Sequence, residues 1–221
     1  MMEMKKITTL FLDIGGVLLS NGWGHVFRHQ AAKKFNLDIP EMEDRHSLMF
    51  VTFEEGKITM EEYLNRVVFY KQRNFTQSAF RAFMFSLTTP DRDMIALLKN
   101  LKMQYGLKIV AVSNEARELN EFRINRFKLN EWIDLFVSSC YVHIRKPDAA
   151  IFKLALDLAH VAADEVLYID DVQLFVDVAT DLGIKSILHT SYLSTATALQ
   201  NNGISIAINQ IHAKDTIYFN R

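Results

Sequence analysis

The sequence predicts an α/β protein, in which a parallel β-sheet carries helices on both faces and an all-helical segment is inserted near the N-terminus. Three observations support this prediction. An apolar run at residues 9–12 is typical of a buried strand, strand-like and helical patterns alternate from residue 91 onward, and residues 21–87 show helical periodicity without a convincing strand. Strands that alternate with helices of about 10–15 residues form parallel sheets, because the crossover helices cover both faces.

The first predicted strand leads directly into a carboxylate. Residues 9–12 are followed by Asp13 and, after Ile14, by Gly15 and Gly16. An unpaired buried charge is costly, and the carboxyl ends of parallel strands are where open α/β sheets bind ligands. We therefore interpret Asp13 as a site residue, with a simple helix cap or turn aspartate as the alternative.

The inserted segment is predicted to be a separate helical domain. Thr59 and Glu62 have the spacing of a capping box, Thr76 is placed to cap a following helix, and the many phenylalanines of this region fit a bundle core. We expect a helical cap domain at residues 21–87 and a core domain at residues 1–20 and 88–221. Its position next to Asp13 in the chain makes the cap a candidate lid.

The remaining elements follow from periodicity and from the residues that end each helix. Gly106 and Gly183 are suited to end helices, and Pro147 is suited to open one. The expected helices are 91–105, 117–127, 147–160, 172–182 and 195–201, and the expected strands are 107–112, 132–137, 165–169 and 184–188.

Polar residues recur where these strands end. Ser113 and Asn114 follow one strand, although this pair is also common in turns and helix caps. Lys146 precedes a predicted helix N-terminus, which suggests an anion between the two, although a solvated basic pair with Arg145 is an equal alternative. Asp170 and Asp171 end a further strand.

The paired carboxylates favour a bound cation. Neighbouring strand residues point to opposite faces, so one of Asp170 and Asp171 can point toward Asp13. Converging carboxylates repel unless a cation lies among them. Oxygen ligands without a His/Cys cluster favour Mg²⁺ over zinc.

Taken in order, these motifs resemble the haloacid dehalogenase superfamily, most of whose members are phosphatases. The resemblance covers essentially the whole chain and implies a Rossmann-like core with a helical cap. It implies that Asp13 is a nucleophile that forms an aspartyl intermediate. It also implies that Lys146 neutralises charge, and that Ser113 and the backbone of Asn114 hold the phosphoryl oxygens.

The same resemblance implies the metal site. Asp13, the Gly15 carbonyl and Asp170 would bind Mg²⁺, with Asp171 as a further or water-mediated ligand. Gly16 would let the backbone approach the phosphoryl group closely.

One departure from the family pattern concerns proton transfer. Phosphatases of this family usually carry a second aspartate two residues after the nucleophile, but this chain has Gly15 there. General acid–base help is worth about 10²–10⁴-fold, so poor leaving groups are expected to react slowly. His25, Arg28 and His29 are candidate replacements, and Trp23 and His25 are candidate substrate contacts at the hinge.

Three functions remain open at this level. We expect a Mg²⁺-dependent phosphatase acting on a small phosphorylated metabolite through Asp13. The second alternative is a 2-haloacid dehalogenase. These enzymes also lack the second aspartate, and they use the nucleophilic aspartate to displace halide from carbon without metal. The third alternative is a weakly active or non-catalytic protein that binds a phosphorylated ligand.

Composition narrows the partners and the compartment. A net charge of −1 gives no electrostatic case for nucleic acid or an anionic membrane. Cys140 is the single cysteine, which fits a reducing compartment, and no apolar run approaches the roughly 20 residues that span a bilayer. We expect a cytoplasmic protein with a small-molecule substrate, whereas the oligomeric state cannot be read from the sequence.

Overall fold

The computed structural model describes residues 6–206 and contains a five-stranded parallel sheet in the order β3-β2-β1-β4-β5. The strands are β1 (Thr9–Leu12), β2 (Lys108–Ser113), β3 (Leu135–Ser138), β4 (Val166–Asp170) and β5 (Lys185–Leu188). The helices are α1 (His25–Phe35), α2 (Ile39–Glu54), α3 (Met60–Val67), α4 (Gln77–Ser86), α5 (Arg92–Tyr105), α6 (Arg117–Arg126), α7 (Ser139–Val142), α8 (Ala149–Ala159), α9 (Gln173–Asp181) and α10 (Tyr192–Asn201). Within residues 6–206, no helix is both long enough and apolar enough to cross a bilayer.

The strand order confirms the predicted α/β class. The chain winds from β1 through β2 to β3, and then returns to the other side of β1 for β4 and β5. Successive strands are therefore added first on one side of β1 and then on its other side. Ligands of open parallel sheets bind at such a reversal, outside the carboxyl ends of the strands, and this is where β1 places Asp13.

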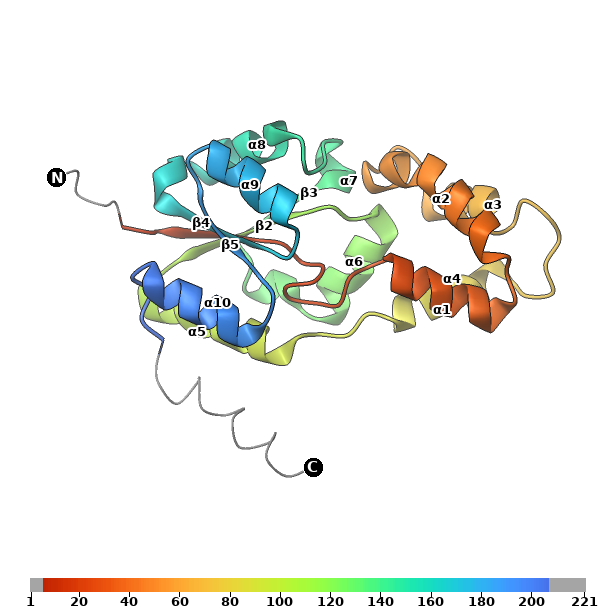
Figure 1. Cartoon of the computed structure of the whole chain (residues 1–221), viewed down its shortest axis with the longest axis horizontal. Coiled ribbons are helices and arrows are strands. Elements are labelled where there is room, and N and C mark those ends of the chain that lie inside the picture. The colour runs from red at the N-terminus through yellow and green to blue at the C-terminus, as the bar shows by residue number, and fades with distance from the viewer. Residues whose placement is uncertain (1–5, 207–221) are drawn as a thin grey trace, which may run out of the picture.

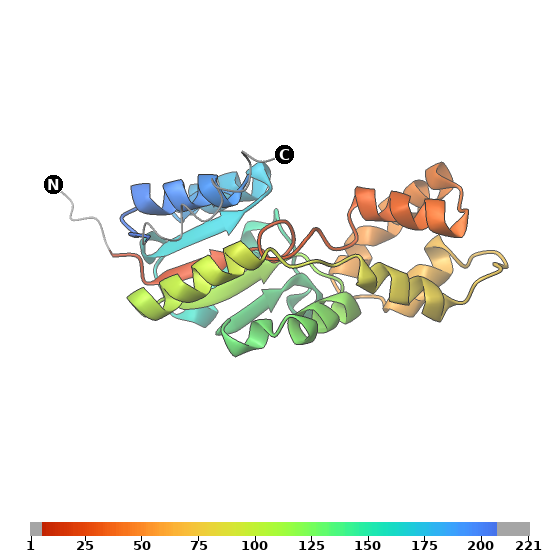
Figure 2. The ribbon, with the colours of Figure 1, turned by 90° about the horizontal axis from the view of Figure 1, so that it is seen from below.

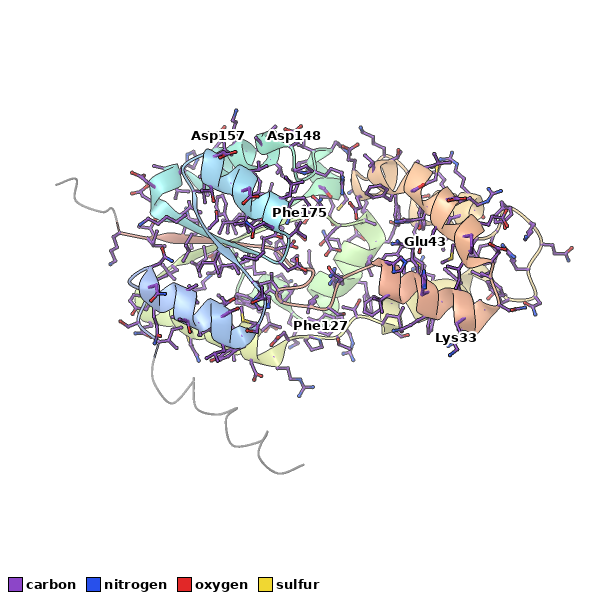
Figure 3. All side chains as sticks on the ribbon, in the orientation of Figure 1. Lys33, Glu43, Phe127, Asp148, Asp157 and Phe175 are labelled. Atoms are coloured by element: carbon purple, nitrogen blue, oxygen red, sulfur yellow. The ribbon has the colours of Figure 1, made fainter. Side chains whose placement is uncertain are left out.

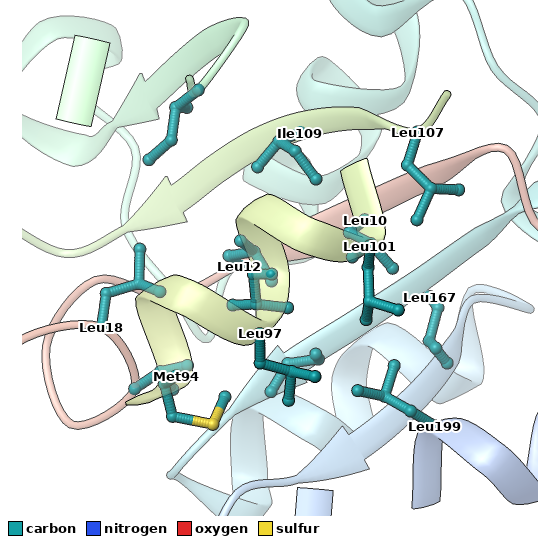
Figure 4. Packing of buried hydrophobic residues seen from close by; sticks show 14 of the residues in the cluster. Leu10, Leu12, Leu18, Met94, Leu97, Leu101, Leu107, Ile109, Leu167 and Leu199 are labelled. Atoms are coloured by element: carbon teal, nitrogen blue, oxygen red, sulfur yellow. The ribbon is translucent and has the colours of Figure 1, made fainter. Parts of the chain in front are cut away.

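The alternation of β1 builds two separate cores. Leu10 and Leu12 face α5 and α10, where they pack with Leu97, Leu101 and other apolar side chains (Figure 4). Phe11 faces the opposite side and packs against residues of α8 and α9. All of β1 is buried, and the helices α8 and α9 cover the face opposite α5 and α10 (Figure 1). The sheet therefore holds Asp13 directly after a fully covered strand.

Helices α1–α4 form a bundle that lies beyond one end of the sheet (Figures 1 and 2). Its core is rich in aromatic rings. The ring centroid of Phe80 lies 4.9–6.2 Å from those of Trp23, Phe35, Phe69 and Phe75. The predicted capping box at Thr59 and the predicted cap at Thr76 are both present. We refer to residues 25–86 as the helical unit.

The two connections to the helical unit run side by side. The Ser20 N–H donates to the Thr89 carbonyl at 2.8 Å, and the Thr89 N–H donates to the Ser20 hydroxyl at 3.0 Å. The division into a cap domain at residues 21–87 and a core domain stays a prediction, and residues 1–5 and 207–221 of the expected core domain lie outside the described residues.

Most predicted elements agree with the structure to within one residue at each end, and three begin two or three residues away from the predicted start. Pro147 does not open a helix: α8 begins at Ala149, because the Asp148 carboxylate accepts from the Ala150 N–H and acts as the cap. The strand expected at 132–137 begins only at Leu135, after a 3₁₀ turn at Leu129–Glu131. The last helix starts at Tyr192, earlier than expected, because Ser191 caps it. Local capping side chains decide the two helix limits.

Candidate active site

The ends of three neighbouring strands bring the predicted polar residues together. Asp13 follows β1, while Ser113 and Asp170 are the last residues of β2 and β4 on either side of it. Their side chains are buried, at 7%, 1% and 0% exposure. The Asp13 N–H still donates to the Ile169 carbonyl at 3.0 Å, which fixes its backbone to the sheet. The parallel order alone makes these residues converge.

Lys146 is the fourth member of this cluster. Its Nζ lies 3.1 Å from Asp13 Oδ1 and 2.6 Å from Asp170 Oδ2, and its side chain is fully buried. The Asn114 side chain binds both backbone polar groups of Lys146. Its Nδ2 donates to the Lys146 carbonyl at 2.9 Å, and its Oδ1 accepts from the Lys146 N–H at 2.8 Å. The lysine is therefore a buried partner of the carboxylates, and the solvated alternative is wrong.

Tyr168 is a buried contributor that the sequence motifs did not reveal. Its hydroxyl donates to Asp170 Oδ2 and lies 3.2 Å from Lys146 Nζ. Tyr168 and Asp170 are two residues apart on β4, so they point to the same face. This spacing was the available signal: a tyrosine that shares a strand face with a candidate site carboxylate.

The electrostatics of the cluster follow from its burial. Burial raises the pKa of Asp13 to about 6, against the opposing effect of Lys146 and with a further increase from Asp170. Burial by itself lowers the pKa of Lys146, but Asp13 and Asp170 outweigh it and raise that pKa overall. One cation thus serves two carboxylates, and the site retains an excess of negative charge that favours a further cation.

Asp171 adds a third carboxylate. Ligand oxygens of Asp13, Asp170 and Asp171 all lie within 4.8 Å of one another. Burial, followed by the charge of Asp170, raises the pKa of Asp171. Gly16 makes room for it, because a β-carbon at position 16 would lie 2.0 Å from Asp171 Oδ2, and the backbone there has φ +77°. Glycine is required at this turn for both reasons.

A cavity of about 300 Å³ lies over this cluster, between the sheet and the helical unit. The core contributes Asp13, Gly15, Lys146, Asp171 and Phe175, the last at the start of α9 on the side of the helical unit (Figure 3). The rest of the wall is formed by the hinge and helical unit with further core residues: Asn21, Gly22, Trp23, Gly24, Arg28, His46, Phe50, Phe53, Glu54, Asn114, Glu115, Ala116, Leu119, Arg145 and Val172. A cavity of this size accommodates a small molecule.

The two predicted hinge contacts differ in position. Trp23 lines the cavity, and its Nε1 donates to the Tyr63 hydroxyl at 2.8 Å. His25 does not line this cavity. It is exposed, and its ring lies 3.9 Å from that of His29 beside a separate surface hollow. His25 and His29 both line that hollow, and neither lines the cavity over Asp13.

His25, His29 and Glu43 form a second group of possible metal ligands. The carboxylate of this group is already paired with an arginine. Arg28 donates to both Glu43 oxygens, with Nε at 2.9 Å from Oε1 and Nη2 at 2.7 Å from Oε2. A guanidinium that binds both oxygens neutralises the carboxylate and opposes a second cation there. Glu43 is labelled on the helical unit in Figure 3.

Sequence reasoning also missed several polar residues of the cavity wall. Glu54 lies at the end of α2 and receives two hydrogen bonds from Arg145, at 3.0 and 2.8 Å. Glu115 follows Asn114 directly and pairs with Arg123 of α6. His46 has Nδ1 2.7 Å from the Tyr63 hydroxyl. A charged residue next to the Ser-Asn pair was a usable signal for Glu115, whereas Glu54 and His46 come from a segment with no motif.

The chain belongs to the haloacid dehalogenase-like hydrolase family, whose model matches residues 7–173. The fold and the cluster of Asp13, Lys146 and Asp170 thus define a hydrolase of this class. Among solved structures, a family enzyme from Bacteroides thetaiotaomicron, BT-2542, in complex with magnesium and inorganic phosphate, superposes with a TM-score of 0.72 at 22% identity, covering 84% of this chain and 96% of that one.

The chain is also similar to a dehalogenase and to a cyclase. The L-2-haloacid dehalogenase of Xanthobacter autotrophicus gives a TM-score of 0.59 at 16% identity, covering 93% of this chain and 86% of that one. Drimenol cyclase drtB of Aspergillus calidoustus is 26% identical over 190 residues, 82% of this chain and 34% of that protein. The chain spans only 11–34% of the length of the curated relatives that it matches.

Proposed function

We propose that this hydrolase is a Mg²⁺-dependent phosphatase that acts on a small phosphorylated metabolite through an aspartyl-phosphate on Asp13. One observation carries the proposal: Asp13 shares a fully buried lysine with Asp170, and a third carboxylate lies beside them. This charge pattern suits a phosphoryl group held next to a cation. The neighbouring BT-2542 structure in complex with magnesium and phosphate supports the same chemistry.

Each residue has a definite task in this reaction. Asp13 attacks phosphorus, and Lys146 Nζ, 3.1 Å from Asp13 Oδ1, reduces the repulsion between the nucleophile and the anionic substrate. Ser113 and the Asn114 backbone N–H hold phosphoryl oxygens. Phosphoryl transfer depends mainly on positioning and charge neutralisation, and the rigid strand ends provide both.

The donor set fits Mg²⁺. Asp13, Asp170 and Asp171 offer only oxygens within 4.8 Å of one another, which Mg²⁺ prefers, and the Gly15 carbonyl would complete the set. Asp170 already accepts from Lys146 and from the Val172 N–H at 2.8 Å, so Asp171 has more freedom to bind metal directly. The bound ion would neutralise phosphoryl charge and align the reacting oxygens.

Replacing Gly16 by alanine is expected to weaken Mg²⁺ binding by about 10–100-fold, the range seen when residues that orient metal ligands are changed. The new β-carbon would lie 2.0 Å from Asp171 Oδ2 and must displace that carboxylate. Isothermal titration of the protein with MgCl₂ measures the affinity.

Gly106→Ala is the matched control for Gly16→Ala. Gly106 also has a positive φ, of +66°, but nothing lies within 4 Å of its β-carbon position. Both variants therefore carry the backbone strain of a left-handed alanine, and only Gly16→Ala crowds a carboxylate. Equal Mg²⁺ affinities in the two variants would remove Asp171 from the proposed metal site.

A dehalogenase is the second candidate, favoured by two observations. Gly15 stands where phosphatases of this family usually carry a second aspartate, and an L-2-haloacid dehalogenase is among the structural neighbours. Against it, Asp170 and Asp171 crowd Asp13 with negative charge, which repels a carboxylate substrate such as a haloacid unless a cation is present.

Hydrolysis of a panel of small phosphate monoesters, with MgCl₂ and with chelator, tests the proposed function. We expect phosphate release that depends on Mg²⁺ and disappears in chelator. Halide release from 2-haloacids that persists in chelator would establish the dehalogenase instead. Binding of phosphate esters without turnover of either substrate class would indicate the non-catalytic alternative.

A further inference from the structure

The proposed reaction lacks an evident proton donor. When Asp13 displaces an alcohol from phosphorus, the departing oxygen needs a proton, and Gly15 has no side chain to give one. A β-carbon at position 15 would lie 3.4 Å from Asn21 Oδ1. The amide of Asn21 therefore borders the space that an acidic residue at position 15 would enter, and an amide does not transfer protons near neutral pH. The donor has to come from elsewhere in the cavity wall.

The described residues that line the cavity include two carboxyl groups other than Asp13 and Asp171, namely Glu54 and Glu115. Glu54 comes from the helical unit, and its Oε2 accepts both hydrogen bonds that Arg145 donates to it. Glu115 comes from the core, two residues after Ser113 at the end of β2. It thus extends from the same strand end as the residues proposed to hold the phosphoryl group.

Glu115 is held firmly in this position. Its side chain is 3% exposed, and Arg123 Nη1 of α6 pairs with its Oε1. Its N–H donates to the Ser139 hydroxyl at 2.9 Å, and that hydroxyl donates to the Glu54 carbonyl at 2.6 Å. These bonds join the core, α6 and the helical unit at the junction visible in Figure 1. Glu115 therefore has a fixed orientation next to the cavity.

The charges around Glu115 suit proton transfer near neutral pH. Burial raises the pKa of Glu115 to about 7; Arg123 opposes this rise, Asp13 and Glu54 add to it, and Lys146 opposes it. An acid that donates and then accepts a proton works best with a pKa near the working pH. His46 does not meet this condition, because burial and Arg28 lower its pKa to about 4.

We propose that Glu115 is the general acid and base of this active site, taking the place of the carboxylate missing at position 15. The inference rests on the proposed phosphatase function. In the first step an Asp13 oxygen bonds to phosphorus, the bond from phosphorus to the leaving oxygen breaks, and that oxygen takes the proton of Glu115. In the second step water attacks phosphorus, the bond to Asp13 breaks, and Glu115 takes the proton of the water.

Leaving-group dependence in the Glu115→Gln variant tests this role. With an alkyl phosphate such as glycerol phosphate, turnover is expected to fall about 10²–10⁴-fold, because the alkoxide needs a proton. With p-nitrophenyl phosphate, whose leaving group needs none, the first turnover keeps its wild-type rate. The second step is slow in the variant, so a burst of about one equivalent of p-nitrophenolate appears, and phosphorylated Asp13 accumulates and is detected by mass spectrometry.

Two further variants separate catalysis from structure. Glu115→Gln leaves the buried charge of Arg123 without its carboxylate partner, so Glu115→Gln/Arg123→Met removes both charges together and is expected to give the same burst. Glu121→Gln changes an exposed glutamate of the same helix as Arg123. This variant is expected to turn over both substrates at the wild-type rate.

The outcomes distinguish this inference from the proposed function. Unchanged alkyl phosphate turnover in Glu115→Gln and in the double variant would overturn the role of Glu115 alone. Equal losses with both substrates and no burst would also overturn it, since that pattern indicates a structural effect. A wild-type protein that is inactive on both substrates with MgCl₂ would overturn the phosphatase function itself.

Discussion

The Asp13→Asn protein is expected to lose turnover by at least about 10⁴-fold, as enzymes do when the nucleophile is removed. An amide cannot attack phosphorus at a useful rate, and the asparagine side chain would still fill the same buried space between β2 and β4. Phosphate release under single-turnover conditions measures the loss. Turnover near the wild-type rate would contradict the proposed mechanism.

The same substitution is expected to stabilise the metal-free fold. Because burial raises the pKa of Asp13 to about 6 from 3.8, the unfolded chain ionises first as the pH rises. The folded wild type therefore loses stability between about pH 4 and 6, and the loss is complete above that range. At about 1.4 kcal/mol for each tenfold difference in proton affinity, the Asp13→Asn variant should gain about 1–3 kcal/mol at pH 7 and nothing at pH 3.

Urea unfolding in chelator at pH 3 and pH 7 checks this gain. Asp157→Asn serves as the control, because Asp157 is an exposed aspartate of α8 and its substitution should change the free energy of unfolding by less than about 0.5 kcal/mol. An Asp13→Asn protein less stable than wild type at pH 7 would show that Asp13 strengthens the fold through Lys146.

Lys146→Met is expected to lower the free energy of unfolding by about 3–5 kcal/mol, the cost of leaving a buried charge without its partner. Lys146 is fully buried and serves both Asp13 and Asp170. Its pKa is raised in the folded protein, so its contribution is complete below about pH 10 and is lost only as the pH rises beyond that. Such a loss is a large part of the roughly 5–15 kcal/mol typical of folded domains.

A double variant separates the charge effect from packing. In Lys146→Met/Asp170→Asn the buried carboxylate is neutralised as well, while the introduced amide keeps an acceptor for the Val172 N–H. This variant should recover part of the lost stability, because residues in direct contact are not additive. Lys153→Met, an exposed lysine of α8, is the matched control and should unfold like the wild type. Equal stability of Lys146→Met and Lys153→Met would refute the buried ion-pair role.

Much of the architecture was predictable from residue patterns. The alternation of strands and helices after residue 91 predicted the parallel sheet, and the phenylalanines and the Thr59 capping box predicted the helical unit. The errors lay at element ends, as at Asp148 and Ser191, where a single side chain decides where a helix begins. Such hydrogen bonds are weak compared with the periodic burial of whole helix faces.

The candidate site divides in the same way. Motifs at strand ends were sufficient to select Asp13, Ser113, Lys146 and Asp170, because the carboxyl ends of parallel strands must meet at one edge of the sheet. The choice between a solvated and a buried Lys146 was not available from the sequence. It depends on Asn114, which holds the lysine backbone from another strand end.

The sequence by itself determined the fold class, the family resemblance and the candidate nucleophile, because these depend on local periodicity and on short motifs whose order is preserved along the chain. Only the tertiary structure decided that His25 lies outside the cavity, that Tyr168 contacts Asp170, and that Glu115 lies in the cavity wall near Asp13. These contacts join segments distant in the chain or depend on the face that a residue presents. Their positions are set by how whole elements pack, which local pattern does not encode.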